Sequence, residues 1–194
     1  MGPTTTAPIV TGSTTEGTTT KVCMIPMGVE SRYVINLNQL TASSQIDISH
    51  GADQGRIYNT AVNGHGSAWM PLPSDKTPYI QVDFGNPTLV SGIITQGNQD
   101  KPMWIKTYKV LGSFDNKEFF PYSNTPGNVV AKIFNGNTDG TTPVRNLFNR
   151  NWLTRYIRIV PLDWTKSGAS LRFNVLGCTR PPTWVDISVP IITP

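Results

Sequence analysis

The chain has 194 residues, which is enough for one well-packed domain with extensions and short for two. Only 14% of the residues are charged, whereas 17 glycines, 16 prolines and many threonines and asparagines are present, so a turn-rich β structure is expected and long helices are not. The formal net charge of +4 comes from scattered basic residues, so nucleic-acid binding is not expected, whereas weak attraction to anionic membranes or acidic glycans is.

The first segment, residues 1–21, is dominated by Thr with Pro, Gly and Ser. Such a composition buries too little apolar surface to offset its chain entropy, so we expect an extended linker that is a candidate for O-glycosylation. The start lacks the hydrophobic stretch of a signal peptide, and no apolar run approaches the roughly 20 residues that span a bilayer. We expect the sequence to begin inside a longer secreted protein; the alternative is an intact cytosolic protein with a disordered tail.

Short strand patterns recur through residues 22–178, the predicted folded domain. Most of them alternate side-chain character at a period of two and are followed by Gly, Asn, Asp or Pro turn residues. The predicted strands are residues 79–84, 89–95, 104–110, 129–134, 155–160 and 171–176. Because no helical segment separates these patterns, the sequence predicts an all-β sandwich or barrel. Residues 179–194 are interpreted as a linker or tail toward a neighbouring module.

Two cysteines, Cys23 and Cys178, lie near the two edges of the predicted domain. As a disulfide they would join its ends and stabilise it by roughly 5 kcal/mol, according to the entropy of closing a loop of that length. The alternative is two unrelated buried thiols. The Thr-rich flank favours the disulfide, because it is typical of proteins in an oxidising compartment.

Many ordered stretches between these cysteines resemble one known family, the discoidin or coagulation factor 5/8 type C domains. They are C-M-I-P-M-G-V-E-S (23–31), L-T-A-S-S (40–44), S-A-W (67–69), Y-I-Q-V-D-F-G (79–85), G-I-I-T-Q-G (92–97), W-I-K-T-Y-K-V (104–110), F-N-G-N-T-D (134–139), R-Y-I-R-I-V-P (155–161) and L-R-F-N-V-L-G-C (171–178). The resemblance implies a distorted jelly-roll β-barrel of about eight core strands, closed by a Cys23–Cys178 disulfide. It also implies a non-catalytic module whose loops at one end bind phospholipids, glycans or proteins.

Three segments fall, by their order, at the loops that face ligands in this family: residues 45–54, 60–66 and 98–103. Their bulky apolar residues, the candidates for lipid contact, are Ile48, Val62 and Met103, a set without an aromatic tip. Polar residues are more numerous and include both histidines of the chain: Asp47, His50, Asp53, Asn63, His65, Asn98, Asp100 and Lys101. The predicted ligand-binding residues are Asp47, Ile48, His50, Asn63, His65, Asp100, Lys101 and Met103.

The polar loops favour a glycan, or a matrix or cell-surface protein, as the partner. Hydroxyls and amides need several directional hydrogen-bond partners in a shallow site, and these loops supply them. Tyr58 or Trp104 could offer an apolar face to a sugar ring, although the family resemblance implies that Trp104 packs inside the barrel. An acidic phospholipid membrane, such as one containing phosphatidylserine, is the alternative partner.

No catalytic motif accompanies these loops: the sequence lacks a G-x-S-x-G elbow, a Walker loop, H-E-x-x-H and a G-x-G-x-x-G turn between strand and helix. We therefore predict a secreted, extracellular adhesion or recognition module and not an enzyme. No cofactor is assigned. Two metal sets were weighed, a zinc set of His50, His65 and a carboxylate and a calcium set of Asp47, Asp53 and Asp100, and neither has sequence-local ligand spacing.

Several polar residues are interpreted as structural. We expect Arg155 and Arg158 to make ion pairs or contacts at the barrel end, because they alternate with apolar residues on a predicted strand. Turn residues that hydrogen-bond the backbone are expected at Asn135, Asn137 and Asp139. Glu30 and Arg56 are expected to brace the ends of the chain.

Overall fold

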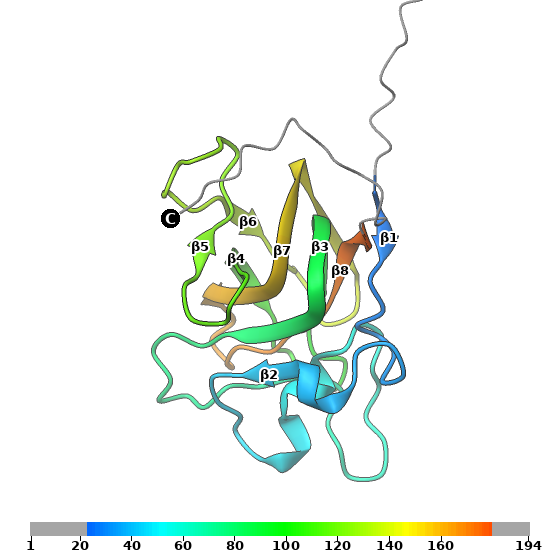
Figure 1. Ribbon diagram of the computed structural model, residues 1–194. Coiled ribbons are helices and arrows are strands. Elements are labelled where there is room, and N and C mark those ends of the chain that lie inside the picture. Colours follow the sequence, from blue (N-terminus) through cyan, green and yellow to red (C-terminus); the bar gives the residue numbers. More distant parts are fainter. Residues whose placement is uncertain (1–22, 180–194) are drawn as a thin grey trace, which may run out of the picture.

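The computed structural model describes residues 23–179, so the predicted linker at residues 1–21 and residues 180–194 of the predicted tail lie outside the described residues. Eight strands pair antiparallel in one strongly curved sheet of order β1-β8-β3-β7-β4-β5, in which β2 also pairs with β3 and β6 with β4 (Figure 1). The strands are β1 (Ile25–Pro26), β2 (Leu40–Ala42), β3 (Ile80–Gln96), β4 (Ile105–Ser113), β5 (Phe120–Pro121), β6 (Ile133–Asn135), β7 (Val144–Trp164) and β8 (Arg172–Thr179). The predicted all-β class is confirmed.

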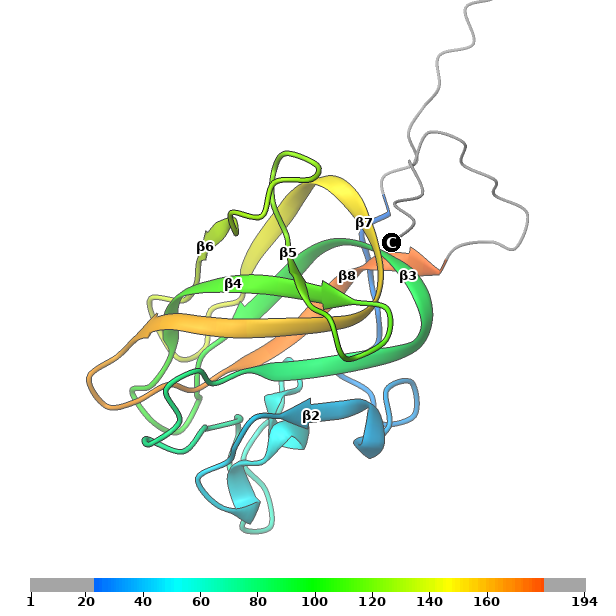
Figure 2. The same ribbon diagram turned by 60° about the vertical axis from the view of Figure 1, so that its left-hand side comes forward.

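Two long strands, β3 and β7, bend so that each forms part of both walls of the fold (Figure 2). The sequence predicts separate strands at 79–84 and 89–95 with a turn at 85–87, and the structure shows one strand of 17 residues instead. The strand bends where its register with β7 shifts between Asp83 and Thr88. Gly85 adopts a φ of 76° there and Pro87 has no N–H to donate, so these residues form a bulge and not a reversal.

The prediction of a strand at 129–134 is wrong in its first half, because β6 begins only at Ile133. The side chains of Val129 and Val130 are 80% and 69% exposed, and the Val130 N–H donates to the Asn128 side chain instead of a strand. Residues 129 and 130 therefore have no buried face, and in this stretch only Phe134 reaches the core. The predicted strands at 104–110, 155–160 and 171–176 are confirmed within β4, β7 and β8.

Helical structure is limited, in residues 23–179, to three 3₁₀ turns: η1 (Leu37–Gln39), η2 (Ile48–His50) and η3 (Ala52–Gly55). Each is three or four residues long, in agreement with the few helix-forming residues in the composition. None of the described helices is long and apolar enough to cross a membrane. In both ribbon views η2, η3 and β2 lie at the bottom of the molecule, whereas β1 and the end of β8 lie in its upper part.

The core fills the space inside the curved sheet with alternate residues of β3, β4, β7 and β8. The indole of Trp69 and the ring of Phe173 are fully buried within it. At the side formed by β4, β6 and β7, Tyr122 stacks on Phe148 with ring centroids 3.9 Å apart, and Tyr108 stacks on Phe134 at 5.4 Å. This dense packing fixes the strand ends from which the loops emerge.

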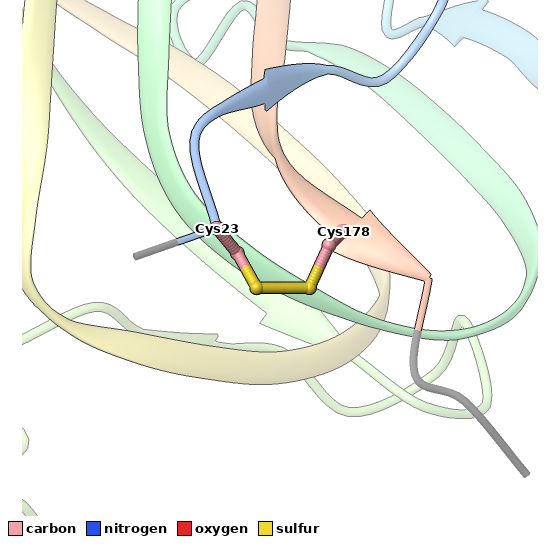
Figure 3. The surroundings of a disulfide bond; sticks show 2 residues. All are labelled: Cys23 and Cys178. Atoms are coloured by element: carbon pink, nitrogen blue, oxygen red, sulfur yellow. A yellow bond between two sulfur atoms is a disulfide. The ribbon is translucent and has the colours of Figure 1, made fainter. Parts of the chain in front are cut away.

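A disulfide joins Cys23, just before β1, to Cys178 in β8, and the two Cα atoms lie 5.3 Å apart (Figure 3). The predicted tie between the two edges of the domain is confirmed, and the alternative of two separate thiols is excluded. Cys178 pairs with Leu89 of β3, whereas Arg172, at the start of β8, pairs with Gln96. The disulfide therefore lies at the far end of β8 from the loops that follow β3.

Of the residues interpreted as structural, Arg155 and Arg158 make the expected contacts, whereas Asn135 ends β6 and is not a turn residue. Arg155 forms a two-pronged ion pair with Asp83, with both N–O distances at 2.8 Å. The guanidinium of Arg158 lies over the rings of Tyr79 and Phe119, at 4.1 and 3.6 Å from their centroids.

The expected brace at the chain ends is also present. Arg56 donates to the Val29 carbonyl at 2.8 Å, and the Asn174 amide donates to the Glu30 carboxylate. These two contacts connect the segment after β1 to η3 and to β8. The first residues of the domain are thereby held against its last strand at a second place besides the disulfide.

Candidate ligand-binding site

Three segments far apart in the sequence meet at one end of the barrel around an open depression of about 410 Å³, here called the loop hollow. They are the η2 region, the connection from 60 to 66, and the connection between β3 and β4. The residues that line the loop hollow are His50, Ala61, Val62, Asn63, Gly64, His65, Gly66, Asp100 and Lys101. The predicted clustering of the three loops is therefore present.

The middle loop is a tight hairpin formed by Val62, Asn63, Gly64 and His65. Val62 and His65 exchange backbone hydrogen bonds of 3.1 and 3.0 Å. Asn63 and Gly64 between them have φ angles of 52° and 79°, the pair of positive values that defines a type I′ turn. Asn-Gly is the dipeptide that best tolerates this geometry, so the sequence itself holds the Asn63 and His65 side chains out into solvent.

The first loop places the His50 ring under this hairpin. Asp47 precedes η2 and accepts from the Ser49 N–H at 2.8 Å, while its Oδ1 lies 2.7 Å from His50 Nδ1. The hydrogen bond from His50 lowers the pKa of the Asp47 carboxyl. A Cβ on Gly66 would lie 2.4 Å from His50 Nε2, so the absence of a side chain at Gly66 lets the imidazole lie directly against the hairpin.

The third loop is organised around Asn98, whose side chain is 1% exposed. Its Oδ1 accepts from the Asp100 and Lys101 N–H groups, at 2.8 and 3.1 Å, and from the Ser67 hydroxyl at 3.0 Å. Its Nδ2 donates to the Ser170 hydroxyl at 3.2 Å. Asn98, expected among the polar loop residues, thus shapes the loop from inside while Asp100 and Lys101 project outward.

Arg172 holds the bases of several loops together, a role that the sequence analysis missed. It is 2% exposed, and its guanidinium donates to the carbonyls of Asn59, Gly97 and Gly140 at 2.7, 2.8 and 2.7 Å. Burial lowers the pKa of this guanidinium. In the L-R-F-N-V pattern the period of two puts Leu171, Phe173 and Val175 on the core face and Arg172 on the opposite face, so the alternation gives no sign that Arg172 is buried.

The structure divides the eight predicted site residues into three groups. Five line the loop hollow: His50, Asn63, His65, Asp100 and Lys101. Asp47 lies outside the lining and orients His50, and Ile48 projects from η2 with 84% of its side chain exposed. The expectation that Met103 is an exposed apolar tip is wrong, because its side chain is only 8% exposed and its Cε lies against Gly168.

Trp104 differs from the packing implied by the family resemblance, since it is only partly buried. Its side chain lines a second depression, next to the turn at residues 135–138. The other aromatic candidate, Tyr58, is 61% exposed and has a φ of 63°. Neither ring belongs to the lining of the loop hollow.

No group of three His, Cys, Asp or Glu side chains is arranged to hold a metal ion within residues 23–179. The calcium set considered from the sequence does not assemble. The Asp53 carboxylate instead pairs with Arg32 and Arg56, and that of Asp100 accepts from the Ser67 N–H. The Asp53 side chain is therefore part of the brace around η3.

An antiparallel β-barrel that presents a set of loops at one end defines a class of recognition modules, and comparison with known proteins identifies the family. Residues 39–175 match the F5/8 type C domain, so the chain belongs to the F5/8 type C, or discoidin, family. Neuropilin-1a of Danio rerio is 38% identical over 160 residues, which are 80% of this chain and 16% of that protein. Coagulation factor VIII of Mus musculus is 35% identical over 161 residues, again 80% of this chain and 7% of that protein.

Solved structures share the fold. Recombinant discoidin II of Dictyostelium discoideum has a TM-score of 0.67 at 22% identity, with 81% of this chain and 60% of that chain covered. The family 32 CBM from C. perfringens NanJ, in complex with galactose, has a TM-score of 0.56 at 14% identity, with 78% and 97% covered. Domains of this family act as non-catalytic modules that bind carbohydrates, proteins or phospholipids.

Proposed function

We propose that this domain is an extracellular recognition module that binds a glycan, or a matrix or cell-surface protein, in the loop hollow. The observation that carries the proposal is the convergence of His50, Asn63, His65, Asp100 and Lys101 on one open depression. Imidazole, amide, carboxylate and ammonium groups together offer donors and acceptors of both kinds. A polyhydroxylated ligand needs that mixture.

The shape of the loop hollow supports a weak, directional site. It is open and shallow, so a terminal sugar or an extended polypeptide enters without a conformational change. The apolar groups of Ala61 and Val62 lie in the lining among the polar ones and offer a surface to the C–H groups of a sugar ring. Such a site has low affinity when single, and repetition along a longer chain raises the overall strength of attachment.

The setting of the domain supports an extracellular location without catalysis. Its disulfide requires an oxidising compartment to persist. The chain spans only 7 to 16% of the length of the neuropilin and factor VIII relatives, so we propose that it functions beside other modules. We assign it no activity of its own, and the predicted boundaries of the module, residues 22 and 178, remain predictions.

An acidic phospholipid surface is the second candidate partner, favoured by one observation. The side chains of Ile48 and Val62 are 84% and 58% exposed at the same end of the barrel, with Lys101 beside them. Burial of each apolar side chain in the lipid boundary would contribute about 1.5 to 3 kcal/mol, and the lysine would meet the head groups.

A glycan array and a phosphatidylserine liposome pull-down, run in parallel on the same protein, test the two candidates. We expect the array signal to fall in His65→Ala and Lys101→Ala, whose side chains are exposed in the loop hollow. Lys117→Ala is the matched control, because that exposed lysine follows the far end of β4. For liposomes, Ile48→Ser is compared with Val129→Ser, an equally exposed apolar residue outside the three loops. An empty array together with liposome binding that Ile48→Ser abolishes would overturn the proposal in favour of the membrane.

A further inference from the structure

Beside the loop hollow lies a second depression of about 500 Å³, here called the tryptophan hollow. It is lined by Trp104, Lys106, Asn135, Gly136, Asn137 and Thr138. These residues come from the start of β4 and from the turn that follows β6, and none of them lines the loop hollow. Asp100 and Lys101, in the connection between β3 and β4, line the loop hollow, and Trp104, just before β4, lines the tryptophan hollow.

The floor of the tryptophan hollow is held close to β4 by backbone hydrogen bonds. The Gly136 N–H donates to the Lys106 carbonyl at 2.6 Å, and the Asn137 N–H donates to the Ile105 carbonyl at 2.9 Å. A Cβ on Gly136 would lie 2.4 Å from the Ile105 oxygen, so this approach requires glycine. The Asn137 amide is also anchored, because it donates to the carbonyls of Thr95 and Thr142 at 3.1 and 2.8 Å. The hollow is therefore preformed.

The tryptophan hollow includes one aromatic residue, Trp104, whose backbone and Cβ are held in place. Trp104 is partly exposed, its Cβ would touch a side chain at Gly97, and its carbonyl accepts from the Thr165 N–H at 3.1 Å. An indole that is fixed at its base and open on part of its surface offers an apolar face to the C–H groups of a sugar ring. Asn135 and Thr138 also belong to the lining, and both are exposed, so their polar side chains are available to hydroxyl groups of a ligand.

Lys106 gives this hollow its charge. Its Nζ lies 3.5 Å from an oxygen of Asp163, and the two side chains are 47% and 60% exposed. The second oxygen of Asp163 accepts from the Trp164 N–H at 2.8 Å, which keeps the carboxylate in place. An exposed pair at this distance contributes little stability, so the ammonium can turn from Asp163 to an anionic ligand at small cost.

We propose that the tryptophan hollow is a separate binding site for an acidic saccharide, with its ring against Trp104 and its carboxylate or sulfate on Lys106. The proposal does not depend on which ligand fills the loop hollow. Lys106 gives the preference for an acidic ligand, and Asp163 limits it, because its negative charge opposes an anionic ligand and competes for Lys106. A neutral sugar makes the contacts with Trp104, Asn135 and Thr138 but gains nothing from the charge of Lys106, so it binds more weakly.

Amide NMR with matched monosaccharides tests this assignment on the folded domain. The probes are galactose, galacturonate and galactose 6-sulfate, and the corresponding glucose series, since the members of each series differ only at C6. We expect the acidic sugars to shift the amides of residues 104–106 and 135–138, with an apparent affinity about threefold to tenfold above that of the neutral sugar. Comparison of the carboxylate-bearing sugars with the sulfated sugars shows which anion is preferred.

Variants distinguish the contribution of the Lys106 charge to binding from that of the Trp104 ring. Lys106→Gln removes the cation without touching the core, and we expect this variant to bind the acidic sugars no more tightly than the neutral sugar, because the negative charge of Asp163 remains. Asp163→Asn is expected to tighten acidic sugars about threefold, because it removes the competitor of Lys106. Trp104→Ala is expected to abolish the shifts at 135–138 for every sugar, and Lys117→Ala, at an exposed lysine outside both hollows, is expected to leave them unchanged.

Two results would overturn the proposal. In the first, no acidic sugar of either series shifts residues 104–106 or 135–138. In the second, those amides shift but Lys106→Gln does not reduce the preference for the acidic member. Neither result affects the test of the loop hollow, which compares the glycan-array signals of the unchanged protein and His65→Ala. The two proposals can therefore fail independently of each other.

Discussion

Single carboxylates determine how the loops of this domain turn, because each accepts hydrogen bonds from nearby backbone N–H groups. Asp139 accepts from the N–H groups of Thr142 and Thr141 at 2.6 and 2.7 Å. Asp115 accepts from that of Lys117 at 2.9 Å, and Asp47 caps η2. Hydrogen bonds to the charged form lower the pKa of all three carboxyls. The turns therefore depend on the carboxylates being ionised.

We predict that the turn at 139–142 loosens in acid, and the sign follows from the direction of the shift. The pKa of Asp139 is lowered from 3.8 by the hydrogen bonds from Thr142 and Thr141. Its contribution to stability is thus complete above pH 3.8 and is lost as the pH falls through the lower value of the folded state. An NMR titration of the Thr141 and Thr142 amides should give a midpoint below 3.8, and Asp139→Asn should abolish that titration. A midpoint at or above 3.8 would contradict the prediction.

At this scale the sequence predicts the outward-facing site residues and misses the inward-facing ones. His50, Asn63, His65, Asp100 and Lys101, which line the loop hollow, are predicted because polar residues gather in the loops, and the Asn63-Gly64 turn accounts for the exposure of Asn63 and His65. The prediction that Met103 is exposed is wrong because an apolar residue in a loop can point inward or outward, and no periodicity distinguishes the two there. The burial of Asn98 and Arg172 depends on carbonyl and hydroxyl partners that are remote in sequence.

Among the secondary-structure elements, β8 connects the loops to the core most directly. It pairs with β1 at one end and carries Arg172 at the other, next to Gln96 at the end of β3. The strand cores were predictable from their alternation. The union of 79–84 with 89–95 into one bent β3 was not, because Gly-Asn-Pro serves equally well as a turn or as a bulge, and the partner strand β7 decides between them.

Replacement of Arg172 by methionine tests how strongly β8 organises the loop end. Methionine fills a similar volume but leaves the carbonyls of Asn59, Gly97 and Gly140 without these donors. We expect the free energy of unfolding, measured by urea denaturation, to fall by about 2 to 4 kcal/mol. Hydrogen exchange should accelerate at residues 97–101 and 139–142. Arg145→Met, at an exposed arginine of β7, is the control, and equal stability of the two variants would refute this role for Arg172.

The molecule as a whole separates its covalent closure from its recognition surface. The Cys23–Cys178 bond joins the beginning of β1 to the end of β8, while the loop hollow and the tryptophan hollow lie at the ends of β3 and β4 that face away from it. Framework residues can therefore stay fixed while loop residues change the ligand. The framework was accordingly the part that the family resemblance predicted best, whereas the shapes of both hollows required the loop conformations.

This separation predicts what loss of the disulfide does. Cys23→Ser combined with Cys178→Ser frees a loop closed over 155 residues of sequence, and we expect the free energy of unfolding to fall by about 3 to 5 kcal/mol. Urea denaturation of the oxidised protein, the dithiothreitol-reduced protein and the double variant checks the value, and the last two should coincide. At urea concentrations below the unfolding midpoint, the folded double variant should still give the array signal of the loop hollow. Neither cysteine belongs to the lining of that hollow. Unchanged stability would contradict the predicted contribution of the disulfide, and loss of binding in a variant that is still folded would show that the disulfide and the recognition end are coupled.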